Sequence, residues 1–202
     1  MELPQARPRI VSGAPSQRRA RLQFVLIAAV FLGPLLLAAW LYFQGNPLQP
    51  SGRTNHGALL EPIVNIGEIL PESAIGGLAD TAWLLLYPNS DACDERCEEA
   101  LYTIRQSRLM LGREMDRLQR VFLHGESPPD TVFLAADHQG LITLEDSKLV
   151  ALLENKRPLD VAAGGYYLVD PLGNLVMYFH PDLNPADMVD DIKHLLRLSR
   201  IG

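Results

Sequence analysis

The sequence has 202 residues, with 18 lysines and arginines, 24 aspartates and glutamates, and a formal net charge of −6. This length allows one domain of ordinary size plus an appendage. Five arginines and one acid lie in residues 1–23, so the rest of the chain carries the negative charge. An acidic body lacks the basic footprint that nucleic-acid binding needs, and we therefore predict no nucleic-acid partner.

The composition and motifs narrow the class further. With 48% hydrophobic residues and only two cysteines, the chain must fold around a packed core rather than a dense set of disulfides. It contains no glycine-rich phosphate loop, no HExxH and no GxSxG. These absences exclude the readily recognised NTPases, zincins and serine hydrolases.

Residues 24–43 (FVLIAAVFLGPLLLAAWLYF) contain no charge. As a helix they would span roughly 30 Å, the thickness of the hydrocarbon core of a bilayer. Trp40, Tyr42 and Phe43 stand at one end, where aromatic rings favour the membrane interface. The alternative is a cleaved secretory signal, but its apolar region is normally shorter and precedes a small-residue cleavage site. Because Gln-Gly-Asn-Pro follows at 44–47, we predict an uncleaved transmembrane helix.

The charges flanking this segment predict its orientation. Five arginines precede it and only Arg53 follows closely, so the positive-inside rule places the N-terminus in the cytoplasm. In a bacterium this means a single-pass inner-membrane protein with a periplasmic C-terminal part. We expect a basic cytoplasmic N-terminus at 1–23, the transmembrane helix at 24–43, a linker rich in Pro, Gly, Asn and Ser at 44–57, and a periplasmic domain at 58–202.

The first elements of that domain surround the two cysteines. We expect residues 59–70 to form an extended segment that leads into the core, with one short strand at most. The apolar run 81–87 (TAWLLLY), stopped by Pro-Asn, predicts a central strand buried on both faces. A helical pattern follows, capped by Ser90 or Asp91 and divided at Gly112. Its apolar positions are Leu101, Ile104, Leu111, Met115 and Leu118.

The remaining elements complete a mixed α/β pattern. Residues 121–123 and 141–144 predict strands, 147–155 predict a helix, and 131–136 fit either a strand or a short helix. A hairpin is expected from 166–170 and 174–179, and a final helix opens at Asn184-Pro185. A βαβ unit that leads into a ββα ending predicts a thioredoxin-like fold, with a central mixed sheet flanked by helices.

Cys93 and Cys97 are the only cysteines and stand four residues apart at the start of the predicted helix. This spacing is compatible with a disulfide or with a dithiol. As thiolates, the pair would suit Cu(I) better than hard cations. A helix N-terminus lowers the pKa of a thiol, whereas the neighbouring carboxylates oppose that shift; the sequence leaves open which effect prevails.

A CxxxC pair at a helix head behind the strand WLLLYP, with YYLVDPLGN further on, resembles the Sco/SenC family. The segments TNHGALLEP, LYTIRQSRLMLGREMDRLQRV and HLLRLSRIG resemble more closely the proteobacterial transmembrane proteins associated with cytochrome oxidase assembly. The resemblance covers about residues 20–202. It implies a membrane-anchored thioredoxin-fold protein whose partner is cytochrome c oxidase subunit II, or its assembly factors. It also implies that Cys93 and Cys97 carry copper or reduce thiols.

One position departs from the Sco pattern. The family places a copper-binding histidine just before the YLxDP strand, where this chain has Ala162. Five histidines are present elsewhere, and we interpret each as an ordinary surface residue: His56, His124, His138, His180 and His194. Trp83, Met177 and the pair Tyr166-Tyr167 are interpreted as core residues.

Three hypotheses follow for the function. The first is an oxidase assembly factor that passes Cu(I) or electrons through Cys93 and Cys97. The second is a non-catalytic interaction module of the oxidase assembly machinery, which the missing histidine favours. The third is a general thiol–disulfide oxidoreductase, which the CxxxC spacing and Gly164-Gly165 disfavour, since thioredoxins carry a proline before the corresponding strand. The sequence leaves open whether the protein is an enzyme, with thiol–disulfide exchange as the candidate activity.

Overall fold

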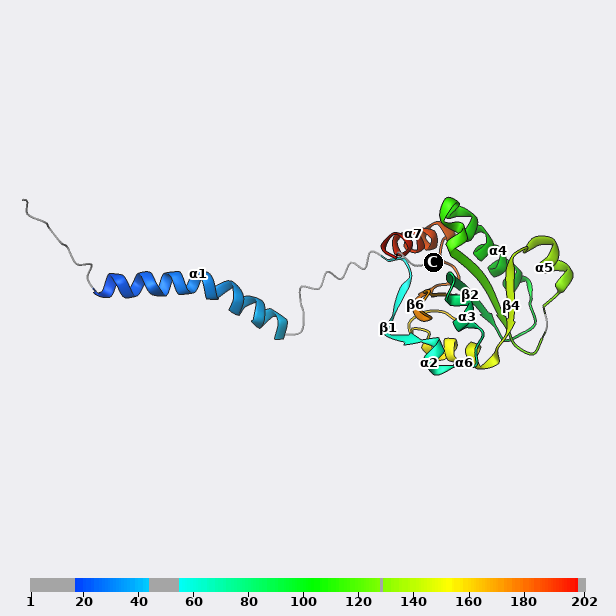
Figure 1. Cartoon of the computed structure of the whole chain (residues 1–202), viewed down its shortest axis with the longest axis horizontal. Coiled ribbons are helices and arrows are strands. Elements are labelled where there is room, and N and C mark those ends of the chain that lie inside the picture. Colours follow the sequence, from blue (N-terminus) through cyan, green and yellow to red (C-terminus); the bar gives the residue numbers. More distant parts are fainter. Residues whose placement is uncertain (1–16, 44–54, 128, 200–202) are drawn as a thin grey trace, which may run out of the picture. The chain divides into compact units, whose positions relative to one another are not determined.

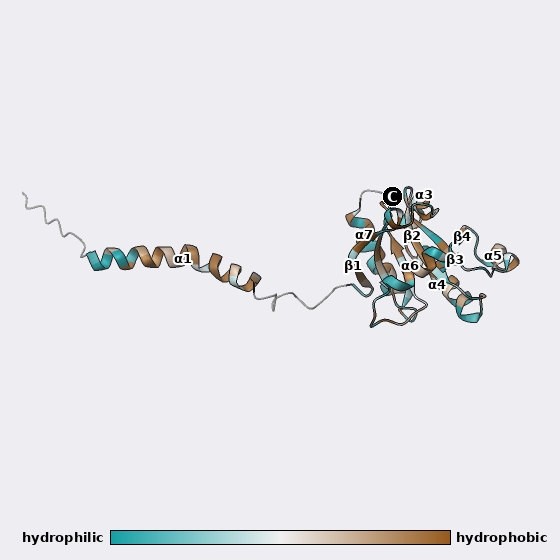
Figure 2. Cartoon of the chain, turned by 90° about the horizontal axis from the view of Figure 1, so that it is seen from below, coloured by the Kyte–Doolittle hydropathy of each residue, from teal (hydrophilic) through white to brown (hydrophobic). Residues whose placement is uncertain are grey.

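A computed structural model describes residues 17–43, 55–127 and 129–199, in two compact units, Met1–Gly52 and Arg53–Gly202. The first unit contains helix α1 (Gln17–Phe43), which includes the whole predicted membrane segment. Its stretch Gln17–Leu41 is long and apolar enough to cross a membrane, judged by length and composition. Figure 2 shows the hydrophilic start of α1 and its apolar continuation. Most of the expected cytoplasmic segment (1–16) and linker (44–54) lies outside the described residues.

The second unit contains a six-stranded mixed sheet with strand order β1-β6-β5-β2-β3-β4 (Figure 1). β2 is parallel to β3 and β3 to β4, whereas β1, β5 and β6 pair in antiparallel fashion. The strands are β1 (Ala58–Asn65), β2 (Trp83–Asn89), β3 (Leu118–His124), β4 (Leu141–Glu145), β5 (Tyr166–Val169) and β6 (Asn174–Phe179). This arrangement confirms the predicted mixed sheet.

Helices cover both faces of the sheet. α4 and α7 contribute to the apolar core on one face, and α2, α3 and α6 to the core on the other. The described helices of this unit are α2 (Ile66–Ile69), α3 (Ile75–Ala79), α4 (Glu95–Met110), the 3-10 helix η1 (Gly112–Arg117), α5 (Thr131–Asp137), α6 (Ser147–Lys156) and α7 (Pro185–Leu198).

The continuous apolar run of β2 is explained by burial on both faces. Trp83, Leu85 and Tyr87 pack into the core under α4 and α7. Leu84 and Leu86 point the other way, into the core under α3 and α6. Because side chains alternate along a strand, a strand covered on both faces needs apolar residues at every position. β2 confirms the prediction of a central buried strand.

The segment before β2 is more ordered than the sequence indicated. Residues 59–70 were expected to be mainly an approach chain, but Ala58–Asn65 forms an eight-residue edge strand paired with β6. Ile66, fully buried, then starts the short helix α2. Leu60, Val64 and Ile66 therefore belong to the core, whereas Ile63 and Ile69 are exposed. Residues 131–136, which fit two interpretations, form a helix capped by Asp130.

The helical pattern after the cysteines is shorter than predicted. α4 ends at Met110, and Gly112 adopts a φ of 62°, a left-handed conformation that glycine adopts without strain. The expected division at Gly112 is therefore confirmed. Met115 lies in η1, and Leu118 is the first residue of β3. Periodicity alone extended the helix too far, because buried strand and turn residues fell by chance into its spacing.

Gly165, which immediately precedes β5, lies in a tightly packed part of the sheet. A Cβ added there would overlap the carbonyl oxygen of Phe179 and the ring of Tyr178, whose hydroxyl already accepts a bond from the Gly165 amide. We expect Gly165→Ala to cost more than about 2 kcal/mol. Gly76→Ala, in open space on α3, should change stability by less than about 1 kcal/mol. Thermal unfolding of the full chain in detergent measures both, and equal losses would contradict this account.

Candidate functional site

Cys93 and Cys97 form a disulfide, with Cα atoms 5.1 Å apart. Cys93 comes just before the N-cap residue of α4, and Cys97 is in the first turn of the helix. Cys97 is only 1% exposed, whereas Cys93 is half-buried. The two sulfurs therefore differ in access, and Cys93 is the one that a partner can reach. The structure thus contains the disulfide, one of the two states that the spacing allows.

The cap of α4 connects the helix to this disulfide. The side chain of Asp94 accepts a hydrogen bond of 3.1 Å from the amide of Cys97. Ser90 or Asp91 was predicted as the cap, and that prediction is wrong. The amide of Asp91 instead donates to the side chain of Asn89, in the turn that leaves β2. Three more residues follow that turn before the helix begins, which moves the cap to Asp94.

The disulfide adjoins a core cluster that contains several aromatic rings. Cys97 belongs to the core cluster that contains Tyr87, Phe122 and Tyr166, and Cys93 packs against that cluster. The rings of Tyr87 and Phe122 stack with centroids 5.9 Å apart, and Tyr166 lies 5.9 Å from Tyr87. Burial raises the pKa of Tyr87 to about 12, with smaller contributions from Tyr166 and Asp94. The core cluster that adjoins the disulfide thus contains groups that stay uncharged at neutral pH.

The outer side is acidic. The carboxylates around the pair are all exposed: Asp91, Asp94, Glu95, Glu98 and Glu99. Exposed acids at a helix N-terminus also suit the positive end of the helix dipole. In the reduced protein these charges would attract a cation or a basic partner surface to the sulfurs, while disfavouring a free thiolate.

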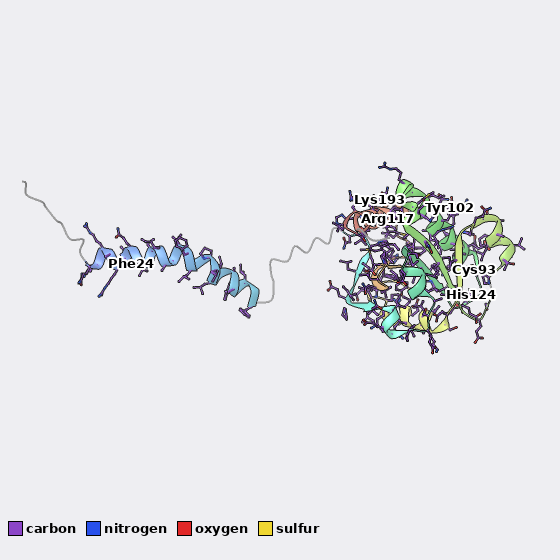
Figure 3. The ribbon with its side chains drawn as sticks, viewed as in Figure 1. Phe24, Cys93, Tyr102, Arg117, His124 and Lys193 are labelled. Carbon is purple, nitrogen blue, oxygen red and sulfur yellow. A yellow bond between two sulfur atoms is a disulfide. The ribbon has the colours of Figure 1, made fainter. Side chains whose placement is uncertain are left out.

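His124 ends β3, opposite Asn89 at the end of β2, so it lies at the same edge of the sheet as the cysteines. Its ring is 5.9 Å from that of Phe122, and its Nδ1 lies 2.8 Å from the carbonyl oxygen of Gly125. Figure 3 labels Cys93 and His124 on the same side of this unit. Among the described residues, however, no group of three His, Cys, Asp or Glu side chains is placed to hold a metal ion.

The position expected for a family histidine lies in the loop between α6 and β5. Ala162 is exposed there, and its carbonyl oxygen accepts a hydrogen bond from the Tyr178 hydroxyl. An alanine side chain offers no ligand. Among the described residues, the soft donors that lie together at this site are therefore the two sulfurs.

The other histidines are spread over the fold. His56 and His194 are exposed, and the half-buried His180 accepts a hydrogen bond at Nδ1 from the amide of Asp182. His138 was interpreted as a surface residue, but it is only 4% exposed and packs against Phe133, so that interpretation is wrong. The predicted core residues are confirmed, since these are all buried: Trp83, Met177, Tyr166 and Tyr167.

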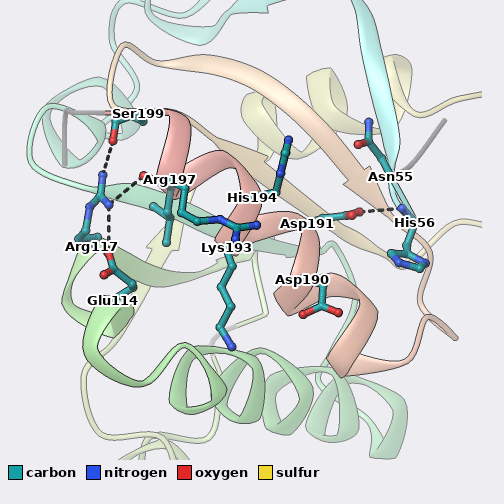
Figure 4. Close-up of a pocket in the computed structure, with 11 residues that line it drawn as sticks. Asn55, His56, Glu114, Arg117, Asp190, Asp191, Lys193, His194, Arg197 and Ser199 are labelled. Carbon is teal, nitrogen blue, oxygen red and sulfur yellow. Dashed lines mark hydrogen bonds and ion pairs between the residues drawn. The ribbon is translucent and has the colours of Figure 1, made fainter.

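A separate hollow of about 860 Å³ lies along α7 (Figure 4). Its polar groups serve the fold. The buried carboxylate of Asp191 accepts hydrogen bonds from the amides of His56 and Gly57, at the end of the expected linker. Arg117 bonds to Glu114 and to the carbonyl oxygens of Leu196 and Ser199. These contacts fasten the start of the second unit and the 3-10 helix η1 to α7.

A mixed sheet covered by helices on both faces, with a disulfide at the head of the helix after a central strand, defines a thioredoxin-like domain. A family model described as the transmembrane-like, thioredoxin-like, C-terminal domain matches residues 83–199, more than half of the chain. A second, the transmembrane-like N-terminal domain, matches residues 15–45. The chain therefore belongs to the transmembrane-like, thioredoxin-like family.

Solved structures similar to the chain include ScoI from Bradyrhizobium japonicum with copper bound, at 18% identity and a TM-score of 0.46, covering 59% of this chain and 88% of that one. Yeast Sco1 with copper bound has 18% identity and a TM-score of 0.49, covering 61% and 81%. The thioredoxin domain of a thiol-disulfide oxidoreductase from Bacteroides vulgatus has 13% identity and a TM-score of 0.42, covering 59% of this chain and 82% of that one. No curated protein matches the chain. The family model confirms the predicted thioredoxin-like class.

Asp94 provides a direct test of the site geometry. Asp94→Ala removes the acceptor for the Cys97 amide and should cost about 1 kcal/mol, the usual effect of losing an N-cap. Asp94→Asn keeps an acceptor and should stay within about 0.5 kcal/mol of the parent. Asp91→Ala is the matched control, because it removes an exposed carboxylate that does not cap the helix. A loss at Asp91 as large as that at Asp94, measured by thermal unfolding, would contradict the assigned cap.

Proposed function

We propose that this protein is a membrane-anchored factor that assists assembly of cytochrome c oxidase through its Cys93–Cys97 pair. The observation that supports it most is the pairing of a half-buried sulfur with a buried one at the head of α4. This asymmetry suits an attacking and a resolving thiol. The oxidase as target follows from the sequence resemblance to oxidase-assembly proteins.

The redox step uses both sulfurs. In the reduced protein, the Cys93 thiolate attacks a disulfide of the partner and forms a mixed disulfide, releasing one partner thiolate. The Cys97 thiolate then attacks Cys93, which releases the second partner thiolate and closes the Cys93–Cys97 disulfide. Two electrons pass to the partner, and the bond present in the structure is the product state. A dithiol reductant must reopen it before the next cycle.

The same reduced pair offers a site for Cu(I) as cargo. Two thiolates are soft ligands suited to Cu(I), and the acidic rim favours a nearby cation. With Ala162 in place of a histidine and no third donor gathered among the described residues, the pair would hold the ion by two bonds. Such a site favours transfer over storage, because a third ligand from the acceptor protein completes the coordination.

A second candidate function is a non-catalytic interaction module of the oxidase assembly machinery. The two-donor site favours it, since it lacks the full ligand set of the Sco pattern. A general thiol–disulfide oxidoreductase is the third, and insulin reduction by the purified protein would favour it. The acidic rim would then serve as a contact surface or limit the choice of substrate.

Replacing both cysteines separates these functions. In a strain carrying Cys93→Ser and Cys97→Ser, we expect oxidase activity and the copper content of subunit II to fall, because electrons and Cu(I) both need the sulfurs. The reduced full chain in detergent should bind one Cu(I), and the double variant none. The matched control is Ser107→Ala on the same helix, which leaves the pair intact.

Two outcomes decide between the candidates. Unchanged oxidase in the double-serine strain would contradict the proposed chemistry. If loss of residues 58–202 nevertheless abolished oxidase activity in the same background, the interaction module would be supported. Reduced oxidase without Cu(I) binding to the purified protein would leave thiol reduction as the working step.

The proposed location is the bacterial inner membrane, with the N-terminus in the cytoplasm and the thioredoxin-like domain in the periplasm. The support is helix α1, with its apolar stretch, and the arginines before it. A reporter that is active only in the periplasm, fused after Gly202, should be active. A reporter that works only in the cytoplasm, fused at the same place, is the control and should be inactive. The reverse pair of results would contradict the orientation.

A further inference from the structure

A second polar site lies on the face of the sheet covered by α4. A cavity of about 290 Å³ is bounded by α4, β3 and the turn between α5 and β4. Three arginines line it, Arg105 and Arg108 from α4 and Arg120 from β3. Arg105 is eight residues beyond Cys97, or about 12 Å along the helix, so the cavity is separate from the disulfide. The function proposed above makes no use of it.

Arg120 is the central group of this cavity. It is only 3% exposed, and its Nη2 donates a 2.7 Å hydrogen bond to the carbonyl oxygen of Gln139. Its Nε and Nη1 are buried and have no hydrogen-bond partner among the described residues. A buried guanidinium is normally paired, because removing its charge from water is costly unless an anion and hydrogen bonds replace the solvent. The described residues supply no hydrogen-bond acceptor to Nε or Nη1 of Arg120.

The charged residues around Arg120 leave the cavity with more positive than negative charge. Three arginines line the cavity, and among the described residues Asp137 is the one acid that does so. Arg108 is partly satisfied, since it bonds to the carbonyl oxygen of Leu118 and to the exposed Asp116. Burial lowers the pKa of Arg120, and Arg108 and Arg105 lower it further, as expected for cations that face one another. The cavity thus carries an excess of positive charge in an acidic protein.

We propose that this cavity binds a small phosphate-type oxyanion. Guanidinium groups present planar, forked donors that match the oxygens of phosphate or sulfate, and three of them, from Arg105, Arg108 and Arg120, line this cavity. The three arginines exceed the one lining acid, Asp137, by two charges, and Arg108 also pairs with Asp116, so a phosphate or sulfate ion supplies enough negative charge to balance the cavity. The volume is at the lower end of the range for ligand pockets, which favours a single tetrahedral group over a nucleotide.

The anion would bridge three segments that are distant in sequence. Arg105 and Arg108 lie three residues apart on one side of α4, Arg120 lies in β3, and Gln139 lies in the turn before β4. An oxyanion held between the arginines would fasten α4 to the edge of the sheet. Binding should therefore raise the thermal stability of the protein, and it should also give a heat of binding that calorimetry can measure.

The test uses the full chain in detergent with sodium phosphate as the probe, at constant ionic strength. Isothermal titration calorimetry should show one phosphate per chain, and the unfolding midpoint should rise with phosphate or sulfate. Chloride at equal ionic strength should have no such effect. Absence of binding and of any midpoint shift with both oxyanions would overturn the proposal.

Matched variants test whether phosphate binds in this cavity. Arg120→Met should abolish phosphate binding, and Arg105→Gln should weaken it about tenfold or more, as expected for a charged hydrogen bond. Arg113→Gln is the control, because it removes an exposed arginine outside the cavity and should stay within about twofold. If Arg120→Met does not fold, Arg105→Gln decides. An equal loss in Arg105→Gln and Arg113→Gln would mean general charge attraction and would overturn the proposal.

A further comparison identifies the form of the anion. Glycerol 3-phosphate carries the same group as an ester, and binding as tight as that of phosphate would support an esterified ligand. Weaker binding of the ester would support the free ion. The copper and oxidase assays of the cysteine variants do not involve this cavity, so failure of either proposal leaves the other standing.

Discussion

The burial of β2 on both faces is the constraint on which the site depends. Because every side chain from Trp83 to Tyr87 is held in one core or the other, the end of the strand is fixed in position. The chain then turns through Asn89 and meets the cap of α4 at Asp94. Cys97 is buried by the packing of α4 on the sheet, and the disulfide holds Cys93 at the rim. The difference in exposure between the two sulfurs thus follows from the packing of the strand and the helix.

The surroundings of the disulfide combine two opposite environments. Tyr87, Phe122 and Tyr166 form an apolar inner layer, and carboxylates occupy the outer rim. A thiolate formed here would gain from the helix N-terminus and lose from the nearby negative charges. A bound cation removes that conflict, since it neutralises the thiolate and is attracted by the rim. The electrostatics are therefore more consistent with a sulfur pair that meets cations or basic partners than with a permanently charged nucleophile.

Several features followed directly from the sequence, for physical reasons that can be named. The run 81–87 predicted β2 because a doubly buried strand needs an unbroken apolar stretch, and the hairpin of β5 and β6 was marked by its turn residues. The cap at Asp94 was missed because Ser90 and Asp91 are equally good capping types, and only the length of the turn decides among them. Residues 59–70 allowed one short strand, but the full length of β1 and its pairing were not predicted, because its partner, β6, is more than a hundred residues away. Sequence periodicity carries no information about such distant pairing.

The arginine cavity was missed for a related reason. Acids in the first turn of α4 and Arg108 in its last turn suit the helix dipole, so the charges of that helix need no ligand to explain them. Arg120 has no such explanation. It stands between Leu118 and Phe122 in a strand whose side chains on that face pack under α4, a position where an apolar residue would cost nothing in desolvation. A buried cation that the protein leaves two-thirds unpaired indicates a site completed by something outside the chain, and the arginines that face it from α4 indicate that its charge is negative.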